Sequence, residues 1–218
     1  TMPLLRAKEL AYPIRKAKIG LAICDHRLMD ELLSAQALAP DLERIIAFGN
    51  GELEGLMQKS GYEDFAAVNT SQDDVCLIAM TSGTTGEPKG TMHFHRDLLA
   101  ICDTFGAHVL CATAQDRFIG SPPLAFTFGG LVLFPFRIGA STVMIERAGP
   151  ADLIAAIYEY KATISFTAPT AYRAMLDEVV QHGTGQLRIC VSAGEALPKS
   201  TFITWREATG ISLLDGLG

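Results

Sequence analysis

The sequence contains no apolar run of the roughly 18–20 residues that a membrane-spanning helix requires. Its densest apolar stretch, "GGLVLFPFRIGA", is interrupted by Pro135 and Arg137. A cluster of basic residues is also lacking and the net charge is −6, which argues against nucleic acid as a partner. The chain does not open with the basic and apolar segments of a secretion signal. We therefore expect neither a membrane nor a nucleic-acid partner.

Cysteine pairs with C-x-x-C spacing are absent as well. The five cysteines are Cys24, Cys76, Cys102, Cys111 and Cys190. An odd number without that spacing indicates reduced thiols, most of them buried, and a cytoplasmic location.

What the sequence does contain is typical of a folded α/β enzyme: 49% of its 218 residues are hydrophobic and 19% are charged. Short apolar runs that predict strands lie at residues 19–24, 44–49, 75–80, 116–121, 141–146, 163–168, 187–192 and 211–215. Helical patterns between them lie at residues 25–38, 95–110, 150–161, 169–182 and 198–209. This alternation predicts an α/β fold with doubly wound, mostly parallel sheets flanked by helices.

Glycines and helix-capping residues predict the ends of helices, and a polar segment predicts a subdomain boundary. Gly183 and Gly210 stand where two of the helices should end, and Asp152 and Thr170 stand near helix starts. The polar segment at residues 69–74 predicts a break between a partial α/β subdomain, 1–74, and a second α/β subdomain, 75–218. Because the chain begins without methionine and stops at "LLDGLG", we expect it to be a piece of a larger protein.

The segment "TSGTTGEPKG", residues 81–90, combines three glycines, four hydroxyl side chains and one lysine. An apolar strand, "VCLIAM", is expected to run buried into it, and the helix at 95–110 is expected to follow it. Glycines let backbone N–H groups approach phosphate oxygens, hydroxyls add donors, and Lys89 adds a positive charge. The segment is not a Walker loop, because Pro88 precedes the lysine and Gly90 follows it. The alternative is a solvent-exposed hairpin rich in turn formers.

This segment resembles the phosphate-binding signature of the adenylate-forming superfamily, which includes acyl- and aryl-CoA ligases and peptide adenylation domains. "SAGEALP", residues 192–198, resembles its adenine-pocket segment, and "DGLG", residues 215–218, resembles the start of its next signature. The resemblance covers essentially the whole chain. It implies that the chain is part of the large amino-terminal region of such an enzyme.

Other stretches are similar to the benzoate and 2-aminobenzoate CoA ligase subgroup. They are "HFHRDLLA", "SPPLAFTFGG", "FPFRIGAS", "FTAPTAYRAML" and "LRICVSAGEALP". One departure is "FTFGGL", where that subgroup has a slightly longer glycine-leucine run. The departure bears on the shape of the acid pocket.

The resemblance implies a reaction in two halves. An aromatic carboxylate attacks ATP to give an acyl-adenylate and pyrophosphate, and coenzyme A then displaces AMP to give a thioester. Neither half needs an enzyme nucleophile, so we expect no catalytic residue and no Ser-His-Asp constellation. Magnesium is expected to accompany ATP, and no protein ligand for a metal is named.

The resemblance also implies site residues. Expected phosphate contacts are Thr81, Ser82, Gly83, Thr84, Thr85, Gly86, Lys89 and Gly90. Expected walls of the adenine pocket are Gly194, Glu195 and Ala196 on one side and Asp215 and Gly216 on the other. Expected neighbours of the acid are Phe126, Thr127, Phe128 and Gly129, because aromatic side chains and glycines suit a benzoate-like ring.

Structural readings of the same residues remain open. "SAGEALP" is also what a strand end followed by a helix with an early proline looks like, and Phe126 and Phe128 are also ordinary core residues. His93 and His95 would share a face of an extended segment. Two ligands alone are weak evidence for a metal site, so we prefer structural roles beneath the loop.

Three functions are compatible with the resemblance. The first is an aryl-CoA ligase, the second an adenylation domain that loads a carrier protein, and the third a nucleotide-binding module without chemistry. Since the superfamily closes its site with a small carboxy-terminal domain, we expect these 218 residues alone to have little or no ligase activity.

Overall fold

The computed structural model describes residues 4–59, 65–81, 88–121, 123–147 and 149–216. The chain divides into two compact units, Met2–Asp97 and Leu98–Gly218. This boundary falls inside helix α4 (His95–Ile101), whereas the subdomain break expected from composition lies at residues 69–74. That residues 75–218 form one nucleotide-binding subdomain remains a prediction.

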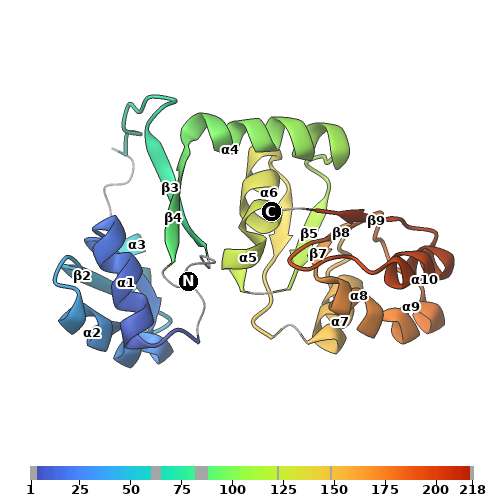
Figure 1. Cartoon of the computed structure of the whole chain (residues 1–218), viewed down its shortest axis with the longest axis horizontal. Coiled ribbons are helices and arrows are strands. Elements are labelled where there is room, and N and C mark those ends of the chain that lie inside the picture. The colour runs from blue at the N-terminus through green and yellow to red at the C-terminus, as the bar shows by residue number, and fades with distance from the viewer. Residues whose placement is uncertain (1–3, 60–64, 82–87, 122, 148, 217–218) are drawn as a thin grey trace. The chain divides into compact units, whose positions relative to one another are not determined.

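The first unit is built around two parallel strands with two helices packed on them (Figure 1). Its elements before the glycine-rich segment are α1 (Ala7–Ala17), β1 (Leu21–Asp25), η1 (His26–Leu28), α2 (Met29–Leu38), β2 (Arg44–Phe48) and α3 (Glu52–Met57). Helix α1, which the sequence patterns did not predict, starts where the Glu9 carboxylate accepts a hydrogen bond from the Arg6 N–H at 2.8 Å. Ala11 and Ile14 of α1 are buried against Leu32 and Ala35 of α2.

The glycine-rich segment lies between two antiparallel strands, β3 (Val75–Thr81) and β4 (Lys89–Phe94). Two expectations were therefore wrong. A strand, not the helix, follows the loop, and β3 is largely exposed in this chain instead of buried. Strand β4 escaped prediction because glycine, lysine and histidine interrupt its apolar pattern.

The second unit contains a five-stranded sheet with the order β6-β5-β7-β8-β9, and all its pairs are parallel. The strands are β5 (Arg117–Gly120), β6 (Ser141–Val143), β7 (Ile164–Thr167), β8 (Ile189–Ser192) and β9 (Leu213–Asp215). After α4 the helices are η3 (Cys102–Val109), α5 (Leu124–Phe128), η4 (Gly129–Leu133), α6 (Phe134–Ile138), α7 (Pro150–Glu159), α8 (Pro169–Ala174), α9 (Leu176–His182) and α10 (Lys199–Thr209). The predicted α/β class with a parallel, doubly wound sheet is confirmed.

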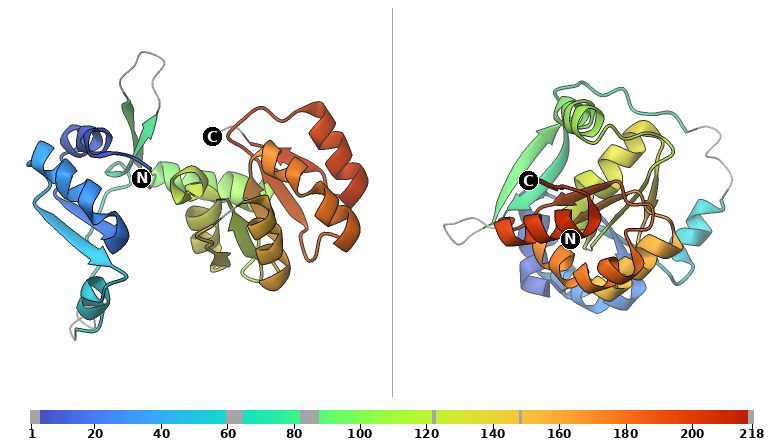
Figure 2. Two further views of the ribbon diagram at one scale, coloured as in Figure 1. Left: turned by 90° about the horizontal axis from the view of Figure 1, so that it is seen from below. Right: turned by 90° about the vertical axis from the view of Figure 1, so that its right-hand side faces the viewer.

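Helices cover both faces of this sheet (Figures 1 and 2). Successive strand residues point to opposite sides, so Phe118 packs in the cluster beneath η3, η4 and α6, while Ile119 packs in the cluster beneath α7 to α10. In the second cluster the Tyr172 ring meets the Trp205 ring edge-on at 4.8 Å. The Tyr172 hydroxyl lies 3.0 Å from both the Ser165 and the Val191 carbonyl oxygens and shares its one hydrogen between them, which links β7 to β8.

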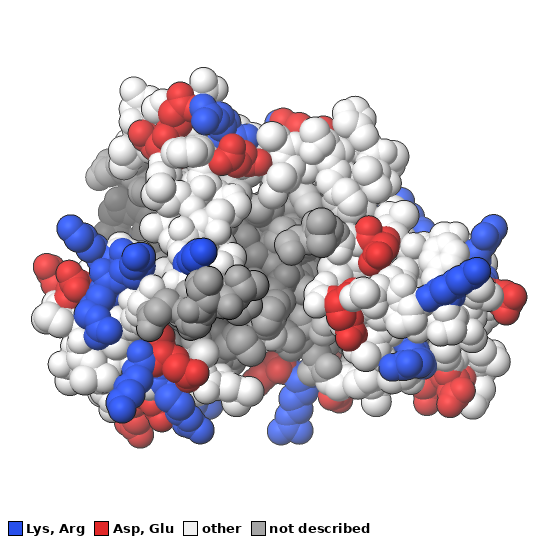
Figure 3. All heavy atoms as spheres, in the orientation of Figure 1, with Lys and Arg blue, Asp and Glu red and all other residues white. Residues whose placement is uncertain are grey.

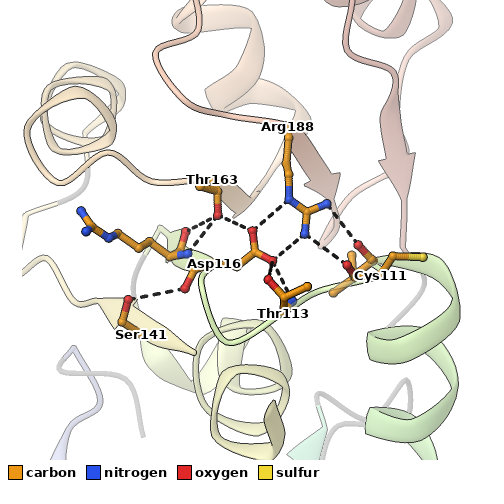
Figure 4. Close-up of polar contacts among 8 residues, drawn as sticks. Cys111, Thr113, Asp116, Ser141, Thr163 and Arg188 are labelled. Atoms are coloured by element: carbon orange, nitrogen blue, oxygen red, sulfur yellow. Dashed lines mark hydrogen bonds and ion pairs between the residues drawn. The ribbon is translucent and has the colours of Figure 1, made fainter. Parts of the chain in front are cut away.

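A network of polar groups closes the edge of the sheet where its parallel strands begin (Figure 4). The Asp116 carboxylate accepts hydrogen bonds from the Arg188 side chain at 2.6 and 2.9 Å and from the Thr163 hydroxyl at 2.7 Å. Its backbone carbonyl accepts from the Ser141 N–H. These residues stand at the starts of β5, β6, β7 and β8, so Asp116 helps to align four strands through its carboxylate and its backbone carbonyl.

The charge state of Asp116 follows from these contacts. Burial alone would raise the pKa of its carboxyl group, but the hydrogen bonds from Arg188, Thr113 and Thr163 outweigh burial and hold the pKa well below its usual range. The carboxylate is therefore ionised and fully engaged at neutral pH.

Two long predicted helices are interrupted. The pattern at 95–110 forms α4 and then the π-helical η3, and the pattern at 169–182 breaks at Met175 between α8 and α9. The glycine stops are confirmed, since Gly183 and Gly210 end α9 and α10 with φ of 78° and 74°. The expectation of mostly buried thiols was wrong, because only Cys102 and Cys190 of the five are buried in this chain.

Candidate active site

A cavity of about 770 Å³ opens at the edge of the five-stranded sheet where the strands end. Its lining includes Ser121, which follows β5, Thr167 at the end of β7, Ala193 after β8, and Asp215 at the end of β9. From β5 the chain passes to β6 on one side and then to β7 on the other. The cavity thus lies where the direction of winding reverses, the usual ligand site of open α/β sheets.

One section of the cavity is aromatic. Phe134 lies between Phe105 and Phe166, with ring centroids 5.6 and 6.1 Å away and tilted planes, and all three rings line the cavity. Phe105 comes from η3, Phe134 from α6 and Phe166 from β7. The stretch before Phe134, η4, is π-helical, and such irregular turns recur at functional sites.

Two glycines allow the backbone to pack closely against Phe166 in this section of the cavity. A Cβ atom placed on Gly130 would lie 2.6 Å from the Phe166 ring, and one on Gly120 would lie 2.6 Å from the Phe166 carbonyl oxygen. Real Cβ atoms do not approach so closely, so only glycine lets η4 and β5 reach Phe166. Gly129 and Gly130 both line the cavity, which leaves room beside the rings.

The other section of the cavity is polar and is formed after β8 and β9. Gly194, Glu195, Asp215 and Gly216 line it, while Ala196 is not among its described lining residues, and the contact of these residues with adenine remains a prediction. Gly194 has a φ of 92°, which favours glycine. The Gly216 N–H donates to the Ser192 carbonyl at 2.7 Å. This bond continues the pairing of β8 and β9 past the last strand residue.

The Glu195 side chain already has protein partners. Its carboxylate accepts hydrogen bonds from the Thr170 hydroxyl at 2.8 Å and from the Thr170 N–H at 3.2 Å. Thr170 lies in the first turn of α8. Glu195 thereby fixes the turn after β8 to the turn after β7, and a role in holding the pocket wall explains its contacts better than a direct bond to a ligand.

Hydroxyl groups lie at the ends of β5 and β7. The Ser121 and Thr167 hydroxyl oxygens are 2.8 Å apart and hydrogen-bonded, and both residues line the cavity. The Thr127 hydroxyl donates to the Ser121 carbonyl at 3.4 Å. Strand order places this pair beside Phe166 and next to the glycine turn after β8.

Only some of the residues expected beside the acid line the cavity. Thr127 and Gly129 line the cavity, Phe128 is not among its described lining residues, and the side chain of Phe126 lies outside what the structure describes. Sequence reasoning missed the aromatic wall of Phe105, Phe134 and Phe166 and the hydroxyls of Ser121 and Thr167. The carboxyl-end rule for parallel sheets, applied to the predicted strands, would have found Ser121 and Thr167.

The phosphate-loop prediction falls largely outside the described residues, since Ser82, Gly83, Thr84, Thr85 and Gly86 lie there. At the base of the hairpin Thr81 pairs with Lys89, and Met80 pairs with Gly90. The Tyr12 hydroxyl donates to the Pro88 carbonyl at 2.8 Å, so helix α1 supports the carboxyl side of the loop. The hairpin belongs to the first unit and the cavity to the second. Their joint role in one nucleotide site remains a prediction.

The histidine pair does not form a shared face. His93 lies on β4, whereas His95 is the first residue of α4, so the premise of the metal interpretation was wrong. Among the residues that the structure describes, no group of three or more His, Cys, Asp or Glu side chains is placed to hold a metal.

None of the described helices is both long and apolar enough to span a bilayer. On the face shown in Figure 3, acidic and basic side chains are interspersed.

Comparison with known proteins shows the family. The family model described as "AMP-binding enzyme" matches residues 1–218. Benzoate–CoA ligase from Thauera aromatica is 31% identical over 99% of this chain and 42% of its own length. Anthranilate–CoA ligase from Pseudomonas aeruginosa is 32% identical over 66% of this chain and 28% of its own length.

A solved structure agrees with these relatives. The anthranilate CoA ligase AuaEII, in complex with anthranoyl-AMP, superposes with a TM-score of 0.86 at 32% identity, over 100% of this chain and 43% of that one. The chain thus spans less than half the length of each of these three relatives. A family match over all 218 residues, a shared fold and relatives above 30% identity lead to one conclusion: the chain belongs to the AMP-binding enzyme family.

Proposed function

We propose that this chain is part of an ATP-dependent aryl-CoA ligase that activates benzoate or 2-aminobenzoate. The observation that carries the proposal is a single cavity with an aromatic section and a polar section, at the carboxyl ends of the parallel strands. Relatives named as benzoate– and anthranilate–CoA ligases support the choice of acid.

In this proposal the acid ring lies among Phe105, Phe134 and Phe166. Tilted aromatic neighbours at about 4.5–7 Å favour a ring in such a position. The adenine lies against the Gly194 turn and the Asp215–Gly216 turn, where backbone polar groups and a flat slot are available. The carboxylate and the α-phosphate then meet between the two sections.

The phosphates are assigned to the hairpin loop. Thr81, Lys89 and Gly90, with the five small residues between β3 and β4, supply N–H groups, hydroxyls and one positive charge. Catalysis then consists of holding two anions in line and neutralising charge on the phosphoryl oxygens. No side chain acts as a nucleophile.

The described residues provide no protein cage for magnesium. In the proposal, magnesium reaches the site with the ATP phosphates, as is usual for this ion. Coenzyme A is the second acceptor in the proposal, and a cytoplasmic location supplies both ATP and a reduced thiol pool.

We expect the 218 residues alone to turn over little or no substrate. The chain spans 42% of the length of the Thauera aromatica relative, and a site that lacks its closing segment loses charge neutralisation and exclusion of water. Robust thioester formation by this piece, with ATP, acid and coenzyme A, would contradict the expectation.

The test uses the protein as its gene encodes it, with pyrophosphate release as the readout for benzoate, 2-aminobenzoate and an aliphatic acid. We expect release with the aromatic acids and thioester formation when coenzyme A is added. Pyrophosphate release without transfer to coenzyme A would favour the carrier-loading alternative. Absence of release with any acid would favour the module without chemistry.

The Lys89→Ala variant tests the loop assignment. Loss of a charge that stabilises phosphoryl oxygens is expected to lower the rate of adenylate formation by about a hundredfold or more. Lys199→Ala, at an exposed position on α10, is the matched control and should leave the rate unchanged. Equal rates for Lys89→Ala and the wild type would show that the loop is not the phosphate site.

A further inference from the structure

The cavity carries few polar side chains. Among its described lining residues only Ser121, Thr127, Thr167, Glu195 and Asp215 have side-chain hydrogen-bonding groups. Glu195 and Asp215 belong to the turns assigned to adenine. The hydroxyls of the remaining three are therefore the polar side-chain groups beside the aromatic section.

Two of these hydroxyls form a pair with spare capacity. Of Ser121 and Thr167, one hydroxyl donates to the other at 2.8 Å, so the hydrogen of the accepting hydroxyl is not used in that bond. Within the described part of the chain no further hydrogen bond engages either hydroxyl. The Thr127 hydroxyl, in contrast, uses its hydrogen on the Ser121 carbonyl.

The pair is held at a fixed place beside the rings. Thr167 is 4% exposed and follows Phe166 directly in β7. The Ser121 N–H donates to the Phe166 carbonyl at 3.2 Å, and the Thr167 carbonyl accepts from the Ala193 N–H at 3.2 Å. These backbone bonds fix both side chains to the sheet edge, between the aromatic wall and the glycine turn after β8.

We propose that the Ser121–Thr167 pair is a specificity determinant that hydrogen-bonds an amino or hydroxyl substituent on the ring of the aromatic acid. The inference rests on the proposed function of the cavity. An amino substituent donates an N–H to a hydroxyl oxygen of the pair, and a hydroxyl substituent can also accept the unused hydroxyl hydrogen. The pair therefore matches a substituent that donates a hydrogen bond, whether or not it also accepts one.

Mutual bonding makes the pair tolerant. A polar group left unpaired by a ligand would cost free energy, but the bond between these two hydroxyls persists when the ring carries no substituent, so only one hydroxyl hydrogen is left without a partner. The pair therefore favours 2-aminobenzoate without rejecting benzoate, and we expect a moderate preference, about three- to tenfold in kcat/KM.

The experiment compares Ser121→Ala, Thr167→Val and Thr167→Ser in the protein as its gene encodes it. For each, kcat/KM is measured with 2-aminobenzoate and with benzoate, and the dissociation constant of 2-aminobenzoate is followed by its own fluorescence. We expect Ser121→Ala and Thr167→Val to lower the ratio of the two kcat/KM values about three- to tenfold. Thr167→Ser, which keeps a hydroxyl, should restore the ratio.

A matched control is Thr201→Val. Thr201 is also buried, at 3% exposure, but it lies on α10 away from the cavity lining, so this variant should leave the ratio unchanged. If Thr167→Val does not fold, the inference is tested by the kcat/KM ratio of Ser121→Ala, at its half-buried position, and by the fluorescence titration of that variant.

Equal losses for both acids, or no loss for either, would overturn the inference while leaving the ligase assignment standing. A wild-type protein that activates neither acid and does not bind 2-aminobenzoate would overturn the proposed function instead. The two failures are thus distinguishable.

Discussion

The two edges of the five-stranded sheet use similar side chains for opposite purposes. At the edge where the strands begin, the Asp116 carboxylate accepts hydrogen bonds from both Thr163 and Arg188. At the edge where they end, Ser121 and Thr167 bond to each other and keep one hydroxyl hydrogen unused beside a cavity of about 770 Å³. The same chemistry thus aligns strands at one edge and remains available for recognition at the other.

The largest expected effect on stability is at the edge of the sheet where the strands begin. Asp116→Ala removes a buried carboxylate that accepts hydrogen bonds from Arg188, Thr113 and Thr163, and loss of these bonds is expected to cost about 3 kcal/mol of unfolding free energy. Asp103→Ala, which breaks the exposed pair with Arg137, should cost far less. Urea unfolding of both variants measures the difference. Equal losses would show that the network does not hold the strands.

At the edge where the strands end, the largest expected effect on stability is that of Gly130→Ala. The added Cβ would meet the Phe166 ring at 2.6 Å, and such overpacking costs about 1–3 kcal/mol. Because the displaced ring lines the cavity, we also expect weaker binding of the acid. Gly55→Ala, with no atom near its Cβ position in α3, is the control. Unchanged affinity of the Gly130→Ala variant for the acid would show that Gly130 does not shape the acid-binding site.

Acid titration sharpens the contrast between the edges. The folded-state pKa of Asp116 lies below its usual value, so its carboxylate adds stability above the usual aspartate pKa. This stability is lost as pH falls through the folded-state pKa. Wild type and Asp116→Asn should therefore differ most in unfolding free energy near neutral pH and converge in acid. A difference that does not change with pH would contradict the assigned ionisation.

The smallest expected effect concerns the adenine wall. Thr170→Val removes the hydroxyl that donates to Glu195 and keeps the N–H contact. Since both side chains are exposed, we expect KM for ATP to rise about two- to threefold with kcat nearly unchanged. Thr170→Ser should restore KM. A change in kcat alone would argue against a role in holding the wall.

Sequence patterns predicted the parallel sheet well for a physical reason. Buried parallel strands read as short apolar runs, and each run from 116–121 onward contains an observed strand. Strand β4 was missed because an exposed hairpin strand needs no such run. The π-helical segments were missed because one extra residue per turn leaves no periodic trace over so short a stretch.

Residues that line the cavity were predicted only where they are local in sequence. Gly194, Glu195, Asp215 and Gly216 lie within two short motifs that mark the polar section. Phe105, Phe134 and Phe166 are far apart in the chain and meet only through packing across η3, α6 and β7. An aromatic wall assembled from three separate elements has no sequence motif, so it could be found only once the fold was known.

The most direct test is a crystal structure of the protein as its gene encodes it, grown with 2-aminobenzoate and a non-hydrolysable ATP analogue. We predict the acid ring among Phe105, Phe134 and Phe166 and the adenine against the Gly194 and Asp215 turns. A ring and an adenine both bound away from the carboxyl ends of β5, β7, β8 and β9 would contradict the account.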